Sequence, residues 1–204
     1  TSVINLLNRF YEIDSGEISI DGINIKDYKL SNLRKNIGIV LQDVFLFSDT
    51  IFNNITLKDE SISLNEVKLA AKQIGVHDFI MSLPNNYYYN VKERGIMLSS
   101  GQRQLIAFLR VYVSDPQILI LDEATSSIDS TSEVLIQNAT EKLTNNRTSL
   151  IIAHRLATIK KANNIIVMDS GNIIEQGSHK ELISNMDGYY KKLYDVQFQV
   201  KNVS

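Results

Sequence analysis

The feature that most constrains the fold is an apolar run that ends in two carboxylates. Residues 118–121 read Ile-Leu-Ile-Leu, and Asp122 and Glu123 come directly after them. An unbroken apolar run of this length predicts a strand buried on both faces, as in a parallel sheet. A carboxylate at the end of such a strand can hold Mg²⁺, and its neighbour can orient or deprotonate an attacking water. The alternative is a solvated acidic pair that caps the next helix.

Strand and helix patterns alternate along the chain and predict an α/β fold with a mainly parallel sheet. Buried strands are expected at residues 37–41, 118–121 and 148–153, and antiparallel hairpins at 17–25 and 164–176. Helices are expected at residues 1–10, 64–75, 76–83, 99–113 and 130–143, with two more near the C-terminal end. Ligands bind at the carboxyl ends of parallel strands. Gln42, Asp122 and His154 all lie at such ends.

Composition excludes several classes of protein. The sequence has no cysteine, which rules out disulfides, thiolate metal sites and cysteine nucleophiles. Its net charge of −2 offers no basic field for nucleic acid, so we expect no nucleic-acid partner. No apolar run approaches the roughly 18 residues of a membrane span. The length of 204 residues suggests a single domain with an inserted subdomain.

One further segment and two single residues have two interpretations each. Ser99, Gly101 and Gln102 open a predicted helix, where free amides and small residues suit a phosphate, although Ser99 could simply be an N-cap. Gln42 could contact Mg²⁺ or water, or be an ordinary residue at a strand end. His154 could contact a γ-phosphate or be structural.

Taken in order, these segments resemble the ATPase domain of the ABC transporter family over essentially the whole chain. The matching motifs are VLQDVFLF (the Q-loop), LSSGQ (the signature), ILILDE (Walker B with the catalytic glutamate), SSID (the D-loop) and IIAHR (the switch histidine). The opening TSVINLLNRFYEIDSGEISIDG resembles the segment after the P-loop lysine, which gives Thr1 the Mg²⁺-binding hydroxyl position. The resemblance extends to the loop Glu93-Arg94-Gly95, which contacts the membrane domain in exporters.

The resemblance implies a P-loop NTPase (RecA-like) fold: a mainly parallel sheet flanked by helices, with a β-hairpin region and an inserted helical subdomain. Residues 1–204 would be one ABC ATPase domain. Its RecA-like core would comprise residues 1–46 and 111–204, and the helical subdomain residues 47–110. The protein would be an ATPase and translocase that uses ATP and Mg²⁺.

The family also implies a role for each matching residue. Thr1, Gln42 and Asp122 would serve Mg²⁺, and Ser2 would join Thr1 in cofactor binding. Catalysis would fall to three residues: Glu123 on the water, His154 on the γ-phosphate, and Gln42.

The implied partners are a second ABC ATPase domain, bound head to tail, and a transmembrane domain. Ser99, Gly101 and Gln102 would cover the nucleotide held by the other domain, and Asp129 would couple the two sites. The Gln42 region and Glu93-Arg94-Gly95 would contact the transmembrane domain at the cytoplasmic face of the membrane. Whether the pair is a homodimer or a heterodimer stays open.

The chain departs from the family pattern in three places. The glycine-rich loop and its lysine are missing from these 204 residues, so we expect a portion of a longer protein that by itself binds ATP weakly. Ser100 replaces a usual glycine, at a cost of about 1 kcal/mol if the position needs a positive φ. Lys92 also replaces a usual glycine.

Two other functions compete with an exporter ATPase. One is a soluble ABC protein that acts on nucleic acid or ribosomes, which the Glu93-Arg94-Gly95 loop and the lack of a basic patch disfavour. The other is a non-hydrolytic regulatory half of a heterodimer, which Glu123 and His154 disfavour. Tyrosines 87–89 could face the membrane domain or a surface loop, and Tyr189-Tyr190 is interpreted as core packing.

Overall fold

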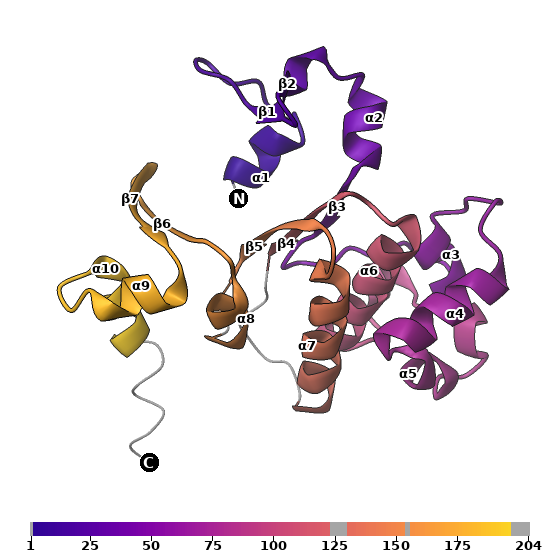
Figure 1. Cartoon of the computed structure of the whole chain (residues 1–204). Coiled ribbons are helices and arrows are strands. Elements are labelled where there is room, and N and C mark those ends of the chain that lie inside the picture. Colours follow the sequence, from indigo (N-terminus) through magenta and orange to yellow (C-terminus); the bar gives the residue numbers. More distant parts are fainter. Residues whose placement is uncertain (1, 123–129, 154–155, 197–204) are drawn as a thin grey trace. The chain divides into compact units, whose positions relative to one another are not determined.

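The computed structural model describes residues 2–122, 130–153 and 156–196, and the chain divides into two compact units, Thr1–Ile151 and Ile152–Ser204 (Figure 1). The predictions for Thr1, Glu123, Asp129 and His154 therefore fall outside the described residues.

The N-terminal part of the first unit is built around a tight hairpin. Its elements are α1 (Ser2–Leu7), β1 (Ser19–Ile20), β2 (Ile23–Asn24), the 3-10 turn η1 (Ile25–Asp27) and α2 (Leu30–Lys35). Asp21 and Gly22 both have positive φ (50° and 78°), as a two-residue hairpin turn of the primed type requires. Arg9 donates to the carbonyl of Ile25 at 3.1 Å, and Arg34 donates to that of Asn8 at 3.2 Å. These two guanidinium groups tie the hairpin and α2 to the end of α1.

A three-stranded sheet with the order β3-β4-β5 forms the centre of the first unit. Its strands are β3 (Ile37–Val40), β4 (Ile118–Asp122) and β5 (Thr148–Ile152). β3 and β4 run parallel, with Ile37 opposite Ile118 and Val40 opposite Leu121. Leu119, Ile120 and Leu121 are buried, as the apolar run predicts. β5 is only partly buried.

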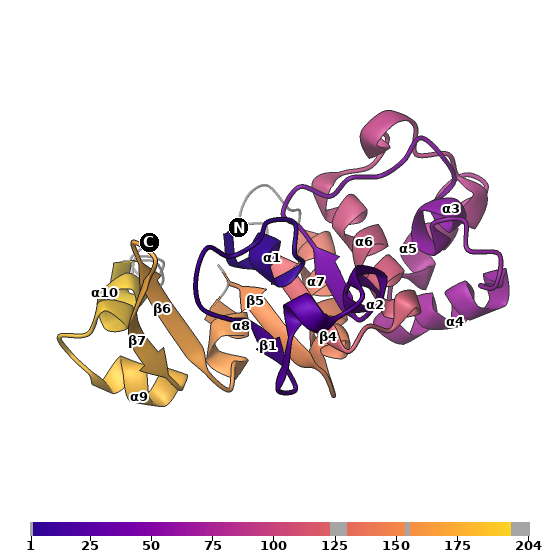
Figure 2. The same cartoon turned by 90° about the horizontal axis from the view of Figure 1, so that it is seen from above.

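Helix α6 (Ser100–Ser114) packs against β3, and the helices around it complete the main core. The helices of this region are α3 (Ile51–Thr56), α4 (Leu64–Ile74), α5 (His77–Met81), α6 and α7 (Ser130–Thr144), with the 3-10 turns η2 (Asn86–Tyr88) and η3 (Glu93–Gly95). In both views α6 lies between α7 and α3 (Figures 1 and 2). Leu105, Ile106, Phe108 and Leu109 fill the buried face of α6. This single helix therefore connects the sheet to the helical region.

The second unit combines a hairpin with three short helices. Its elements are α8 (Leu156–Lys161), β6 (Ile165–Asp169), β7 (Asn172–Gly177), α9 (His179–Ser184) and α10 (Tyr189–Tyr194). Ser170 and Gly171 form the hairpin turn with positive φ, as predicted. The carboxylate of Glu175 accepts the backbone N–H groups of Tyr189 and Tyr190 at 3.1 and 2.6 Å. It thus caps α10, whose own N-cap residue is a glycine without a capping side chain.

The sequence patterns missed three helices, α2, α3 and α8, each of six residues. Such short helices contain too few turns to show a periodicity of their own. Within the residues that the structure describes, no helix is both long and apolar enough to cross a membrane.

Candidate functional site

The carboxyl ends of β3 and β4 bring two of the predicted site residues to the same edge of the sheet. Val40 lies opposite Leu121 in the parallel pair; Gln42 comes two residues after Val40, and Asp122 is the last residue of β4. Gln42 is exposed and Asp122 is half-buried. An amide oxygen and a carboxylate oxygen are hard donors that suit Mg²⁺. The residues present therefore fit the ion that the resemblance implies.

Of the other residues expected at this edge, Ser2 is among those that the structure describes, and Glu123 and His154 are not. Ser2 is exposed and begins α1. Glu123 comes directly after β4 in the sequence, and His154 comes two residues after the end of β5, but their positions are not among those described. Across the described ranges 2–122, 130–153 and 156–196, no three His, Asp or Glu side chains are grouped as a metal cluster.

The signature segment forms a capped start of α6. Ser99 is the N-cap: its hydroxyl accepts the N–H of Gln102 at 3.2 Å, and the Gln102 side chain accepts the N–H of Ser99 at 3.0 Å. This is a reciprocal capping box. Ser99 is therefore an N-cap, and its side chain and that of Gln102 each bond to the other residue's backbone. Gly101, the second residue of the helix, is buried.

Ser100 carries no left-handed strain. It is the first residue of α6 and is not among the residues with positive φ. The cost expected for a serine that needs a positive φ therefore does not arise, because a right-handed helical residue accepts a Cβ freely.

The segment after Gln42 is held by a buried amide. Asn54 on α3 is fully buried, and its side chain accepts the N–H of Phe47 at 2.8 Å and donates to the carbonyls of Phe47 and Thr50, both at 3.0 Å. Arg110 on α6 donates to the carbonyl of Asn54 at 2.8 Å and to that of Phe45 at 3.4 Å. Burial lowers the pKa of the Arg110 guanidinium. The chain after β3 is therefore fixed to both α3 and α6.

Two aromatic rings on this segment remain outside the core. Phe45 and Phe47 are 54% and 53% exposed, and their rings meet edge to face with centroids 5.1 Å apart. Leu46, between them, is fully buried. The segment is thus anchored by one side chain and presents two aromatic ones.

The loop before the signature contacts this same segment. A Cβ added to Gly95 would lie 2.9 Å from Cδ1 of Leu46 and 3.0 Å from Cδ of Arg103. Gly95 also has a φ of +69°, so glycine suits the position for two independent reasons. Arg103 in turn donates to the carbonyl of Leu98 at 2.7 Å. The loop, the Q-loop segment and the signature helix α6 therefore form one packed unit.

Lys92, at the start of this loop, has a backbone conformation that glycine favours. Its φ is 60° and its ψ is −170°. A residue with a Cβ in this region stores about 1–3 kcal/mol of strain. This observation agrees with the resemblance, in which glycine is usual here.

The tyrosines before this loop have separate roles. Tyr87 is buried and its hydroxyl lies 2.9 Å from Nδ1 of His77, and burial raises its pKa to about 12. Tyr88 is 58% exposed, and its ring lies 6.4 Å from that of Phe52. Tyr190, in the second unit, is buried, and its hydroxyl lies 2.7 Å from Nδ1 of His179. Tyr87 and Tyr190 are therefore core residues, whereas Tyr88 faces outward. The core interpretation is wrong for Tyr189, which is 45% exposed.

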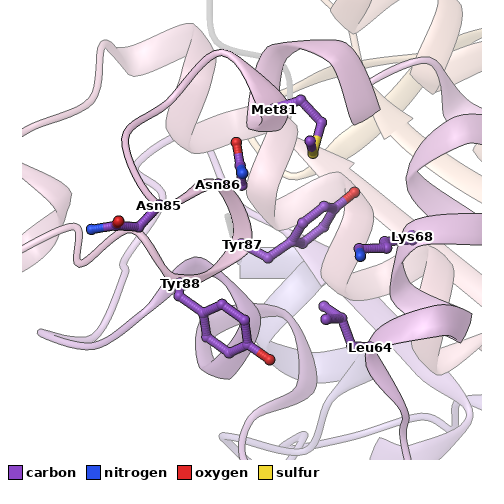
Figure 3. Close-up of a pocket in the computed structure, with 7 residues that line it drawn as sticks. All are labelled: Leu64, Lys68, Met81, Asn85, Asn86, Tyr87 and Tyr88. Atoms are coloured by element: carbon purple, nitrogen blue, oxygen red, sulfur yellow. The ribbon is translucent and has the colours of Figure 1, made fainter.

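A small pocket lies beside Tyr87 (Figure 3). It is lined by Leu64, Lys68, Met81, Asn85, Asn86, Tyr87 and Tyr88, and has a volume of about 110 Å³. Pockets that hold cofactors usually measure about 300–1,000 Å³. This hollow is therefore too small for a nucleotide, and it is built by α4, α5 and η2, away from the strand ends.

The parallel strand pair and the helix α6 that packs beside it fit a fold of the P-loop NTPase class. The model of the family described as "ABC transporter" matches residues 1–126. The chain belongs to this family, which confirms the resemblance and the expected fold class.

The relatives and the solved structure point to exporters. The chain is 49% identical over 197 residues to multidrug export ATP-binding/permease proteins of Staphylococcus aureus strains NCTC 8325 and COL, covering 97% of this chain and 34% of each relative. A structure described as a bacterial Atm1-family ABC exporter with ATP bound matches with a TM-score of 0.87 and 41% identity, over 97% of this chain and 34% of that one. The chain thus spans about a third of the length of these relatives.

Proposed function

We propose that this chain is the ATP-binding and ATP-hydrolysing motor domain of an exporter that moves a substrate across a membrane. The placement of Gln42 and Asp122 at one edge of the parallel sheet carries the proposal. Support comes from the match, over 97% of the chain, to an exporter with ATP bound.

In this proposal the polar residues at the sheet edge share the work on MgATP. Thr1, Gln42 and Asp122 provide oxygen ligands for Mg²⁺, which neutralises charge on the phosphates when it is bound. Ser2 supports phosphate binding at the start of α1. Glu123 orients the attacking water, and His154 donates toward the γ-phosphate.

The proposed partner at the nucleotide is a second ABC ATPase domain, bound head to tail. The phosphates that it holds would be covered by the start of α6, where Ser99, Gly101 and Gln102 lie. The capping box holds this helix start in place, so the positive end of the helix dipole is preorganised for an anion. Asp129 couples the two sites across the interface.

The other proposed partner is the transmembrane domain of the same transporter, which places this domain at the cytoplasmic face of the membrane. The exposed rings of Phe45 and Phe47, and the adjoining Glu93-Arg94-Gly95 loop, form the contact surface. Aromatic side chains are enriched at protein interfaces. The packing of Gly95 against Leu46 lets both segments move as one body.

The 204 residues alone are proposed to bind MgATP weakly. The sequence contains no G-x-x-x-x-G-K-[ST] loop, whose amides and lysine hold the β- and γ-phosphates. Calorimetry with the 204-residue chain should detect no tight binding, and submicromolar affinity would contradict this.

The test of hydrolysis is Glu123→Gln in the full-length protein. We expect ATP turnover to fall by at least about 100-fold, because the variant retains the shape but loses the base. Light scattering of the ATPase domain alone, extended upstream to restore the P-loop and carrying the same change, should show dimers that form only with MgATP. Glu133→Gln, the same change at an exposed position on α7, is the matched control and should hydrolyse ATP normally. Unchanged turnover in Glu123→Gln would refute the proposed role.

A further inference from the structure

The loop at residues 92–94 carries three charged side chains between two buried residues. Lys92, Glu93 and Arg94 are all exposed, whereas Val91 and Gly95 on either side are buried. The backbone N–H of Val91 donates to the carbonyl of Asp49 at 3.0 Å, and that of Lys92 donates to the Asn90 side chain at 2.9 Å. The loop is therefore held at its start by hydrogen bonds.

Its other end is held by packing. Gly95 lies against Leu46 and Arg103, so closely that a Cβ would come within 2.9 and 3.0 Å of them. Both ends are thus fixed, and the charged side chains between them project from a preorganised support. Preorganisation reduces the ordering cost of binding a partner.

A lysine at position 92 destabilises the domain through its backbone conformation. Its φ of 60° and ψ of −170° belong to a region that is essentially reserved for glycine. Strained residues of this kind cluster at functional contacts, where the surroundings hold them in place. The side chain is exposed, so packing inside the domain does not explain the lysine.

The two cations of the loop lack a counterion in the part of the chain that the structure describes. The ion pairs found there are Arg9–Glu12, Lys58–Asp49, Arg147–Asp115 and Lys191–Asp195, and none involves Lys92 or Arg94. Asp49, the acid tied to the loop through Val91, is already paired with Lys58 at 3.0 Å. With Glu93 as the only acid among its three charges, the loop has a net charge of +1.

We propose that Lys92 and Arg94 bind an acidic side chain on the cytoplasmic side of the membrane-spanning part, with Lys92 as the residue that determines this pairing. The inference rests on the proposed function. Exposed apolar residues adjoin the loop: Ile96, which follows Gly95, is 76% exposed, and Phe47, which follows Leu46, is 53% exposed. Cations with exposed apolar neighbours fit a protein surface that presents a carboxylate among apolar side chains.

Zero-length crosslinking with a water-soluble carbodiimide tests this directly on the full-length transporter in lipid nanodiscs. The reagent joins a lysine amine to a carboxylate in contact with it, forming an amide. We expect mass spectrometry to find Lys92 joined to an Asp or Glu of the membrane-spanning part. Lys92→Arg should lose this crosslink, because a guanidinium does not react, while the crosslink of the exposed Lys58 to Asp49, an ion pair at 3.0 Å, persists. Crosslinks of Lys92 only within residues 1–204, or none, would overturn the inference.

Exchanging the charges of Lys92 and its acidic partner distinguishes ion pairing from a merely structural role of Lys92. Lys92→Glu should lower ATP turnover by about 10-fold, and reversing the crosslinked acid to lysine should do the same. Combining the two reversals should restore most of the rate, which a merely structural effect would not do. A Lys92→Glu variant with wild-type turnover, or a double variant without recovery, would refute the pairing.

The outcome for Glu123→Gln separates failure of the pairing from failure of the proposed function. If turnover depends on Glu123 but Lys92 makes no crosslink to the membrane part, only the pairing fails. If the full-length protein does not hydrolyse ATP at all, the proposed function fails, and the pairing that rests on it fails too.

Discussion

Truncating Asn54 should loosen the segment that comes after Gln42. The Asn54 side chain is fully buried and makes hydrogen bonds to the N–H of Phe47 at 2.8 Å and to the carbonyls of Phe47 and Thr50 at 3.0 Å. In Asn54→Ala both carbonyls keep another donor. The N–H of Asp49 donates to the Phe47 carbonyl at 2.8 Å, and the N–H of residue 54 donates to the Thr50 carbonyl at 3.0 Å. Only the Phe47 N–H loses its partner.

The expected magnitude is set by these contacts. A donor left without a partner costs about 1–3 kcal/mol, and the lower part of that range applies because the Phe47 ring is exposed and water can approach. Removing a buried amide also leaves a small cavity and forfeits packing, for about 1 kcal/mol more. We therefore expect Asn54→Ala to lower the free energy of unfolding by about 2–3 kcal/mol.

Urea denaturation measures this loss, with the midpoint shifting at a constant m-value. Asn53→Ala is the matched control, since the neighbouring side chain makes a single part-buried hydrogen bond to Asp49 at 2.8 Å and should cost only about 0.5–1 kcal/mol. If Asn54→Ala is no more destabilising than Asn53→Ala, the clamp does not hold this segment and the reasoning is wrong.

Three further changes should be informative. Gly38→Ala should cost about 2–3 kcal/mol in thermal unfolding, because its Cβ would lie 2.5 Å from Cγ of Pro116; a cost below about 0.5 kcal/mol would contradict this packing. Glu175→Ala should cost the second unit about 1–2 kcal/mol, since α10 loses the carboxylate that caps it, and unaltered amide exchange in α10 would contradict the cap. The hydrogen bond from Asn53 is the main cause that lowers the pKa of Asp49. The ionised Asp49 therefore stabilises the fold above the unfolded-state pKa of about 3.9, and this stabilisation is lost as pH falls through the pKa of Asp49 in the folded state. Asp49→Asn should therefore flatten the fall in urea midpoint on acidification, and an unchanged slope would refute this role.

Features that depend on neighbours in the sequence were predictable. The apolar run before Asp122 predicts β4, because a strand buried on both faces needs no polar residue along its length. Asp21-Gly22 and Ser170-Gly171 predict their turns, since these residue types accept positive φ at low cost. The motif order also placed the chain in its family, and the alternation of elements predicted that Gln42 and Asp122 would share an edge.

Only the tertiary structure decided how the segments around that edge are held. The hydrogen bond from Arg110 to Asn54 and the packing of Gly95 against Leu46 join residues that are far apart in the chain. No local pattern encodes such contacts, because they depend on which faces of α3 and α6 meet after the chain has packed.

The tertiary structure also decided the local conformation at positions that the sequence left open. Ser99 is an N-cap whose partner is Gln102, and Ser100 is an ordinary helical residue, because α6 begins where its amides meet these side chains. Lys92 is strained because the contacts on both sides of its loop impose its backbone angles. Sequence thus determined the kinds of elements and the chemistry at their ends, whereas packing between distant segments determined the conformation of the loops that join them.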